Sequence, residues 1–230
     1  MADTEEIERT LTISPSSLSF FLDCGLAWKR KYLDHWAVPD AAPALAGSFL
    51  HRAVADFLTG GPFPLWGDLM DEIGEKTDAD PFAVKEQAER QWSIWSANTL
   101  FRSPDGVEIE IRTDDPALGR VHCFLDYVQV PALVDHKFVG KLGRKKEALQ
   151  LAFYRRFAPC TTKWAYELIG PEEYRVQWVS VLEMDKADAL IDATLDCIKA
   201  GEFTASPKRY GRDPFCMYCP FQNDCEEVPR

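Results

Sequence analysis

The sequence predicts an α/β fold in which a mainly helical first part is followed by a sheet, further helices and a loop rich in cysteine. Before residue 100 the apolar residues recur at helical spacing, as in Leu50, Val54 and Phe57. From Val107 they alternate with charged residues, as in a half-buried strand. A basic helix, two further strand-like runs and a last helix follow, so the order of elements favours a mixed central sheet flanked by helices.

We expect these elements to form one domain of 230 residues. Ser14 followed by Pro15 is typical of a helix N-terminus, with Ser14 as the cap. The expected helices cover residues 14–33, 45–58, 65–73, 81–100, 144–157 and 186–200. The expected strands cover residues 107–111, 121–130, 132–138, 163–169 and 174–182. Within the domain, 11–100 is the mainly helical part, 105–182 is the core, and 183–230 holds a helix and a cysteine cluster.

Composition and charge limit the classes of function. The chain is 46% hydrophobic, has no apolar run near the roughly 20 residues that a membrane span needs, and starts with an acidic segment unlike a signal peptide. We therefore expect a cytoplasmic protein with no membrane partner. A net charge of −11 argues against nucleic acid, but binding depends on local charge. Basic residues gather at 29–31 and between 137 and 156, although such runs are often only solvated helix faces.

Three residues near the predicted central strands could do chemistry together. Asp135 and Lys137 share one face of a strand, with His136 on the other face, and Asp126 lies on the preceding strand. Two carboxylates at close range favour a cation such as Mg²⁺ between them. Lys137 could then orient a water molecule or stabilise charge on a phosphorus centre. A surface ion pair is the other interpretation of so short a motif.

The neighbouring motifs give this acidic pair a wider context. Their order resembles that of the RecB-like nucleases of the PD-(D/E)XK superfamily, which have a helical G-x-x-x-H, a G-x-x-D strand, a (D/E)-x-K strand and a Q-x-x-x-Y helix. The matching positions are Gly47 and His51, an acidic strand near Glu108 and Glu110, Asp126, Asp135 and Lys137, and Gln150 and Tyr154. Cys123 stands where the family usually has its strand glycine.

The resemblance implies a restriction-endonuclease-like core and a deoxyribonuclease that hydrolyses DNA phosphodiester bonds with Mg²⁺ or Mn²⁺. It implies that the metal is held by His51, Asp126, Asp135 and the main-chain carbonyl of His136. It implies that Lys137 is catalytic and that Gln150 and Tyr154 line the same site. The family analogy suggests an exonuclease acting on ends of single-stranded DNA, in recombination, repair or CRISPR spacer processing, with protein partners from those processes. It also suggests a prokaryotic or phage setting.

A basic segment beside this site suits a polyanionic substrate. We expect it to contact DNA through Lys141, Arg144, Lys145 and Lys146. A second interpretation is a partner subunit of the same fold that binds DNA without cleaving it.

The cysteines form a separate pattern. Cys216, Cys219 and Cys225 have a spacing that lets thiolates converge on one metal centre, and Cys24 is the candidate fourth ligand. This arrangement resembles the iron–sulfur members of the RecB-like family, the AddB nucleases and the Cas-four exonucleases, and so implies a 4Fe-4S cluster. A zinc site, in a structural protein held together by the ion, is the alternative. We expect Cys123, Cys160 and Cys197 to be core thiols.

Overall fold

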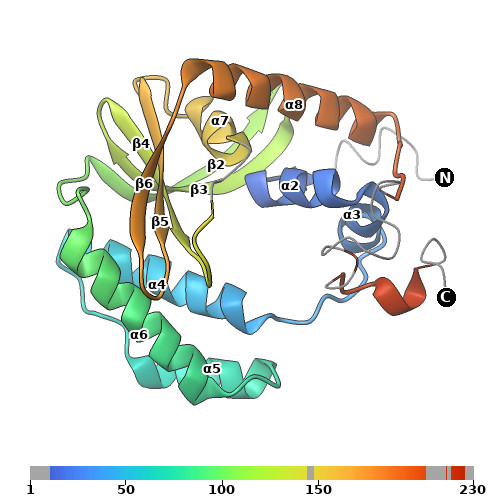
Figure 1. Cartoon of the computed structure of the whole chain (residues 1–230). Coiled ribbons are helices and arrows are strands. Elements are labelled where there is room, and N and C mark those ends of the chain that lie inside the picture. Colours follow the sequence, from blue (N-terminus) through green and yellow to red (C-terminus); the bar gives the residue numbers. More distant parts are fainter. Residues whose placement is uncertain (1–10, 144–147, 206–215, 217–218, 226–230) are drawn as a thin grey trace. The chain divides into compact units, whose positions relative to one another are not determined.

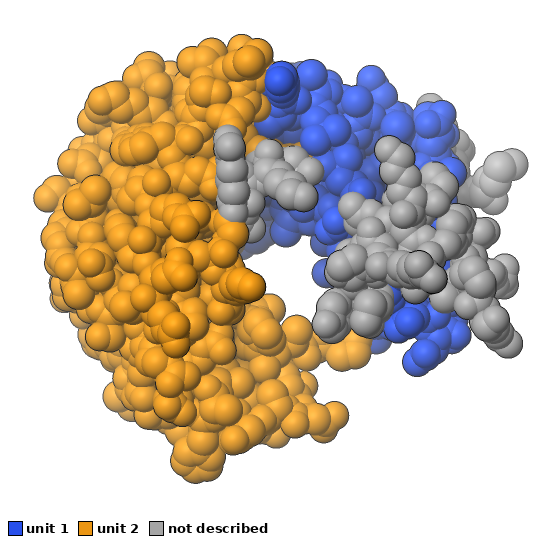
Figure 2. All heavy atoms as spheres, viewed as in Figure 1, with its two compact units in different colours: residues 1–38, 111–123, 186–230 blue, residues 39–110, 124–185 orange. Residues whose placement is uncertain are grey.

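The computed structural model describes residues 11–143, 148–205, 216 and 219–225. The contacts within the chain define two compact units, coloured separately in Figure 2. We call residues 39–110 and 124–185 the sheet unit, and residues 1–38, 111–123 and 186–230 the terminal unit. Each is described by itself below.

The sheet unit is built on a mixed sheet, as the sequence predicts. Strand β3 (Gly119–Gln129) pairs antiparallel with β4 (Ala132–Phe138), β4 pairs parallel with β5 (Lys163–Ile169), and β5 pairs antiparallel with β6 (Tyr174–Val179). Strand β2 (Gly106–Asp115) pairs with β3. The predicted bounds of β4 and β5 are confirmed. Both strands are buried along most of their length, as expected for a parallel pair with both faces covered.

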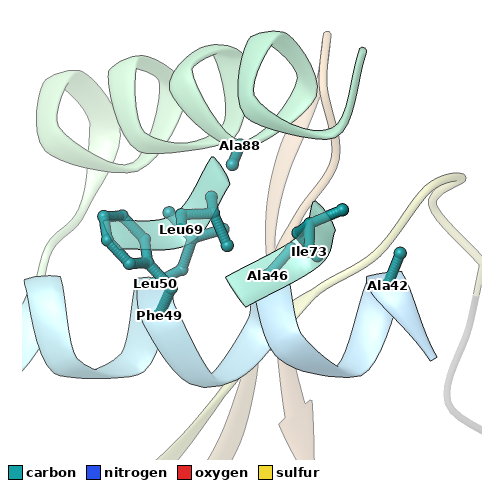
Figure 3. Packing of buried hydrophobic residues seen from close by; sticks show 7 residues of the cluster. All are labelled: Ala42, Ala46, Phe49, Leu50, Leu69, Ile73 and Ala88. Carbon is teal, nitrogen blue, oxygen red and sulfur yellow. The ribbon is translucent and has the colours of Figure 1, made fainter. Parts of the chain in front are cut away.

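Three helices of the sheet unit share one apolar cluster. They are α4 (Ala42–Thr59), α5 (Trp66–Lys76) and α6 (Pro81–Asn98). Figure 3 shows the buried side chains that interlock between them, Ala42, Ala46, Phe49, Leu50, Leu69, Ile73 and Ala88. Burying each of the larger side chains stabilises the fold by about 1.5–3 kcal/mol. Gly60 ends α4 with φ +76°, a left-handed conformation that glycine adopts without strain.

Helices cover both sides of strand β4. Helices α4 and α6 lie against the strands from one side, and α7 (Leu149–Arg155) contacts β4 from the other side (Figure 1). Residues on successive positions of β4 therefore enter two different environments. The predicted helix over 144–157 is described only from residue 148, because 144–147 lie outside the described residues.

The terminal unit differs from the prediction near its start. We expected one helix over 14–33, but the chain forms α2 (Pro15–Asp23) and α3 (Gly25–Tyr32), separated by the extended residue Cys24. Ser14 caps α2, as predicted. The break coincides with a close approach at Gly25, where an added Cβ would lie 3.1 Å from the carbonyl oxygen of Thr204. The short strand β1 (Thr12–Ile13) pairs parallel with the start of β3.

The strand predicted over 174–182 is too long. It ends at Val179, and helix α8 (Val181–Lys199) begins directly afterwards. The Glu183 carboxylate accepts a hydrogen bond from the Ser180 backbone N–H at 2.9 Å, and the Ser180 hydroxyl accepts one from the Glu183 N–H at 3.3 Å. This reciprocal capping box starts the helix where apolar alternation alone predicts a strand. Among the described helices, none combines the length and the apolar character needed to cross a membrane.

Candidate metal centre

The pairing of β3 with β4 brings the two predicted aspartates together. Tyr127 lies opposite Val134, and continuing this register by one residue places Asp126 opposite Asp135. The Asp126 carboxylate accepts a hydrogen bond from the His136 backbone N–H at 2.8 Å. Both carboxylates are buried in the sheet unit, which is an expensive environment for two anions without a compensating cation.

Helix α4 and strand β2 add two further groups beside Asp126. His51 Nδ1 lies 3.3 Å from Glu108 Oε1 and 3.5 Å from Asp126 Oδ2. Potential ligand atoms of these three residues all lie within 4.8 Å of one another. A histidine nitrogen and two carboxylates at this separation are a ligand set that suits a divalent cation.

Glu108 was not predicted as a metal ligand. The sequence indicated only an acidic strand near Glu108 and Glu110. Glu108 has φ +47°, in the left-handed region that non-glycine residues rarely adopt. This conformation accompanies the position of its carboxylate beside His51, which alternation along a regular strand could not have foretold.

Asp135 and Lys137 form the close pair that the D-x-K motif predicts. Lys137 Nζ lies 2.7 Å from Asp135 Oδ2. Apart from this ammonium, the Asp135 carboxylate has no hydrogen-bond partner in the described part of the chain. Burial raises the pKa of Asp135 to about 6, although Lys137 opposes the shift. A buried carboxylate left with spare acceptor capacity fits a role as a metal ligand.

The charges of the site act on its two basic side chains. Burial alone would lower the pKa of Lys137, but Asp135 and Asp126 outweigh it, so the pKa is raised and the side chain remains an ammonium. Burial likewise opposes the charged form of His51, while Asp126 and Glu108 raise its pKa above the ordinary value. Lys137 is therefore suited to donating hydrogen bonds to an anionic oxygen.

The other predicted site residues lie in the same unit. Gln150 Nε2 donates a hydrogen bond to the Tyr154 hydroxyl at 2.7 Å, so the Q-x-x-x-Y pair shares one face of α7. The His136 imidazole points to the opposite side of β4, where its Nδ1 lies 2.6 Å from Glu167 Oε2. Of the predicted DNA contacts, Lys141 is exposed, while Arg144, Lys145 and Lys146 lie outside the described residues.

The four candidate cluster cysteines belong to the terminal unit. Burial raises the pKa of the Cys219 thiol, and the thiols of Cys24, Cys216 and Cys225 raise it further. These three thiols therefore lie near enough to Cys219 to act on its charge. In the described part of the chain, however, the cysteine sulfurs do not form a group as close as the one around His51.

The expectation for the remaining cysteines is correct in part. Cys123 is buried, and burial raises its pKa to about 12. Cys197 is only partly buried. Cys160 is exposed, so its assignment as a core thiol is wrong. It follows α7 in the turn before β5, where the chain lies at the surface.

A mixed sheet flanked by helices, with paired acids and a lysine on adjacent strands and a histidine on helix α4, is the arrangement expected of a metal-dependent nuclease. Comparison of the sequence with known families agrees, since residues 12–226 match the PD-(D/E)XK nuclease superfamily. The chain belongs to this superfamily. A search among curated proteins finds no match.

Solved structures share the fold at low sequence identity. The crystal structure of a "putative exonuclease" from Eubacterium rectale has a TM-score of 0.64 and 15% identity, with 94% of this chain and 90% of that chain covered. The crystal structure of SSO0001 has a TM-score of 0.41 and 13% identity, with 99% and 98% covered. The first similarity supports the fold, and the second carries no argument.

Proposed function

We propose that the chain is a DNA exonuclease whose active site is the cluster around Asp126 and Asp135. The observation that carries this proposal is the convergence of the D-x-K pair with the His51, Glu108 and Asp126 group on adjoining elements of the sheet unit. Such a set is expected for the hydrolysis of a phosphodiester, where negative charge must be stabilised next to a metal ligand set.

The ligands that we assign to Mg²⁺ or Mn²⁺ are His51, Asp126, Asp135 and the main-chain carbonyl of His136. Glu108 joins this set as an additional candidate, because its carboxylate shares the group with His51 and Asp126. A bound divalent cation would supply a water of lowered pKa and neutralise phosphate charge. The Lys137 ammonium would donate to the oxygen that gains negative charge, and its raised pKa keeps that proton in place at neutral pH.

Substrate contacts are assigned to neighbouring segments. Gln150 and Tyr154 present one hydrogen-bonded face of α7, which suits orientation of the reacting strand. The basic segment with Lys141, Arg144, Lys145 and Lys146 would bind the DNA backbone, and this binding should weaken with salt. Single-stranded DNA with a free end is the substrate proposed from the family analogy, together with a setting in recombination, repair or CRISPR spacer processing.

The same proposal includes a 4Fe-4S cluster held by Cys24, Cys216, Cys219 and Cys225. Its support is the four-cysteine spacing and the action of three of these thiols on the pKa of Cys219. Zinc is the competing occupant. A Zn–S distance of about 2.3 Å would bring the sulfurs close together, whereas a four-iron cluster holds its thiolates further apart. Iron and sulfide analysis of protein purified without oxygen, beside zinc analysis, separates the two.

Circular and linear single strands of the same sequence provide the test of exonuclease action. With Mg²⁺ or Mn²⁺, we expect the purified protein to release nucleotides from the linear strand and to leave the circle intact. Labels at the 5′ or 3′ end report the direction. Cleavage of the circle would show an endonuclease, and loss of neither substrate would favour a DNA-binding subunit without catalysis.

A further inference from the structure

A buried carboxylate lies next to the candidate metal centre, on the side of β4 opposite to the Asp135 and Lys137 side chains. It belongs to Glu167 of β5, which is the direct partner of His136 in the parallel β4–β5 ladder. The side chains of Glu167 and His136 are 0% and 1% exposed. The D-x-K motif does not involve either side chain, so their burial together calls for its own explanation.

Glu167 is held from several elements at once. Trp95 Nε1 of α6 donates to Oε2 at 3.0 Å, and the Tyr174 hydroxyl of β6 donates to Oε1 at 2.5 Å. The Thr99 hydroxyl, just after α6, also hydrogen-bonds the carboxylate. Burial alone would raise the pKa of Glu167, but His136 and these donors outweigh it, so the pKa is lowered and the carboxylate is an anion. The carboxylate is therefore fixed independently of β4.

His136 links this fixed anion to the metal centre. Its Nδ1 lies 2.6 Å from Glu167 Oε2, and its ring packs edge-on against Trp95 and Tyr127 with centroids 6.2 and 6.0 Å away. The backbone N–H of the same residue donates to the Asp126 carboxylate of the neighbouring strand β3 at 2.8 Å. His136 therefore contacts two carboxylates, that of Glu167 through its side chain and that of Asp126 through its backbone N–H.

We propose that Glu167 is a positioning residue, which fixes the Asp135–Lys137 segment of β4 in its metal-binding geometry by holding the His136 side chain. This inference rests on the proposed function, because it assigns a purpose to the same site. Mutation of a residue that hydrogen-bonds to a metal ligand and orients it typically lowers metal affinity or activity by about 10–100-fold. A buried contact between a carboxylate and an imidazole is by itself weak evidence for stability, so a positioning role is the better explanation of this contact.

Titration of the protein with Mn²⁺ tests the positioning role of Glu167, because it measures metal affinity and does not rely on DNA cleavage. Glu167→Gln keeps the shape of the side chain, but it replaces one of the two acceptor oxygens with an NH2 donor and removes the negative charge beside His136. We expect its Mn²⁺ dissociation constant to rise by about 10–100-fold, with excess Mn²⁺ restoring part of the cleavage rate. The affinity for DNA without metal should stay within about threefold of the wild type.

Tyr174→Phe is the matched control, since it removes another hydrogen bond to the same carboxylate without touching His136. We expect it to lower thermal stability while leaving Mn²⁺ affinity within about threefold of the wild type. If Glu167→Gln fails to fold, His136→Leu decides the matter, because it removes the imidazole and leaves the main chain, and it should weaken Mn²⁺ binding to the same degree.

The possible outcomes distinguish a failure of the Glu167 positioning role from a failure of the proposed metal site. Wild-type Mn²⁺ affinity in a folded Glu167→Gln or His136→Leu protein would overturn the positioning role, and so would an equal loss of affinity in Tyr174→Phe. A wild type that binds no Mn²⁺ would instead refute the proposed metal site, on which the positioning role of Glu167 depends.

Discussion

At the scale of single residues, Lys137 carries one sharply defined role. Its ammonium lies 2.7 Å from Asp135, and the surrounding carboxylates keep it protonated. Lys137→Ala should slow the chemical step by about 10²–10⁴-fold, because it removes one positioned donor. DNA binding should weaken far less. Single-turnover rates at saturating DNA measure the first effect, and binding without metal measures the second.

A lysine outside the site is the control for this variant. Lys85 on α6 forms an i,i+4 ion pair with Glu89 at 2.6 Å. Lys85→Ala should cleave DNA at the wild-type rate, since such pairs stabilise a helix by only a few tenths of a kcal/mol. Equal rates for Lys137→Ala and the wild type would show that the D-x-K motif is a plain ion pair.

The pKa shifts predict how metal binding depends on pH. The pKa of Asp135 is raised to about 6 by burial, and that of His51 is raised above its ordinary value by Asp126 and Glu108 despite burial. Both groups must lose their protons to bind a cation. Mn²⁺ affinity should therefore fall as the pH decreases through these pKa values, by up to about tenfold per pH unit for each displaced proton.

Calorimetric titration across this pH range checks the prediction. His51→Gln removes one of the two competing protons, so the dependence that remains should be at most about tenfold per pH unit. His35→Gln, at an exposed histidine of the terminal unit, should follow the wild-type curve. An affinity that does not change between pH about 5 and about 8 would contradict the assignment of these two ligands.

At the scale of elements, α7 offers a test that separates function from packing. Gln150 is half-buried and bonded to Tyr154, whereas Phe153 on the same helix is fully buried. Gln150→Ala should reduce cleavage by about tenfold or more with little change in melting temperature, because it removes a polar group that we propose to contact the substrate strand. Phe153→Ala should instead destabilise the fold by about 3–5 kcal/mol through cavity formation. A Gln150→Ala protein that melts early but cleaves normally would favour simple packing.

A second element-scale prediction concerns the segment that carries Cys219 and Cys225. Arg30 of α3 donates to the Asp224 carbonyl at 2.9 Å, and its guanidinium lies 4.8 Å from the ring centroid of Trp36. Arg30→Gln should loosen this segment, so the absorbance of the proposed cluster should fade faster in air. Lys29→Gln, on the same helix and paired with Asp34, is the control that should fade like the wild type. An equal rate of absorbance loss in the wild type and in both variants would show that Arg30 does not stabilise the segment around the proposed cluster.

The sequence predicts the bounds of a strand or helix correctly where these bounds depend on residues that are neighbours in the chain. β4 and β5 were predicted with their observed bounds, because an apolar run between turn signals marks a buried strand. The break at Cys24 was missed because the close approach of Gly25 to Thr204 joins positions far apart in the chain. The start of α8 was missed for another reason, since its Ser180 and Glu183 capping box was available in the sequence.

The candidate metal centre likewise contains residues that the sequence predicts and residues that only the folded structure reveals. The D-x-K pair and Asp126 could be predicted from strand alternation and motif order. The contribution of Glu108 depends on its unusual backbone conformation, and the position of Glu167 depends on the β4–β5 register together with donors from α6 and β6. Relations of this kind arise only when the chain is folded, so motif spacing alone could not reveal them.

At the scale of the whole molecule, the proposed cluster would tie residues near both ends of the chain. Cys24→Ala should bleach the cluster and lower the melting temperature, because loss of so long a loop closure frees the unfolded chain and removes four-thiolate binding. Cys160→Ala, at an exposed cysteine, should keep both colour and stability. Full colour in Cys24→Ala protein would place the fourth ligand elsewhere, and a colourless wild type containing zinc would favour the zinc alternative.

The central claim is that the cluster of acids in the sheet unit hydrolyses DNA with a divalent metal. Its most direct test is nucleotide release from end-labelled linear DNA by the wild type and by Asp126→Asn, with Mg²⁺ or Mn²⁺ and with EDTA. Asp126 contacts both His51 and the His136 backbone N–H, so its charge is central to the site. We predict release by the wild type with metal, none with EDTA, and a loss of at least about 10³-fold in a folded Asp126→Asn protein. Release at the wild-type rate by Asp126→Asn, or undiminished release in EDTA, would contradict the account.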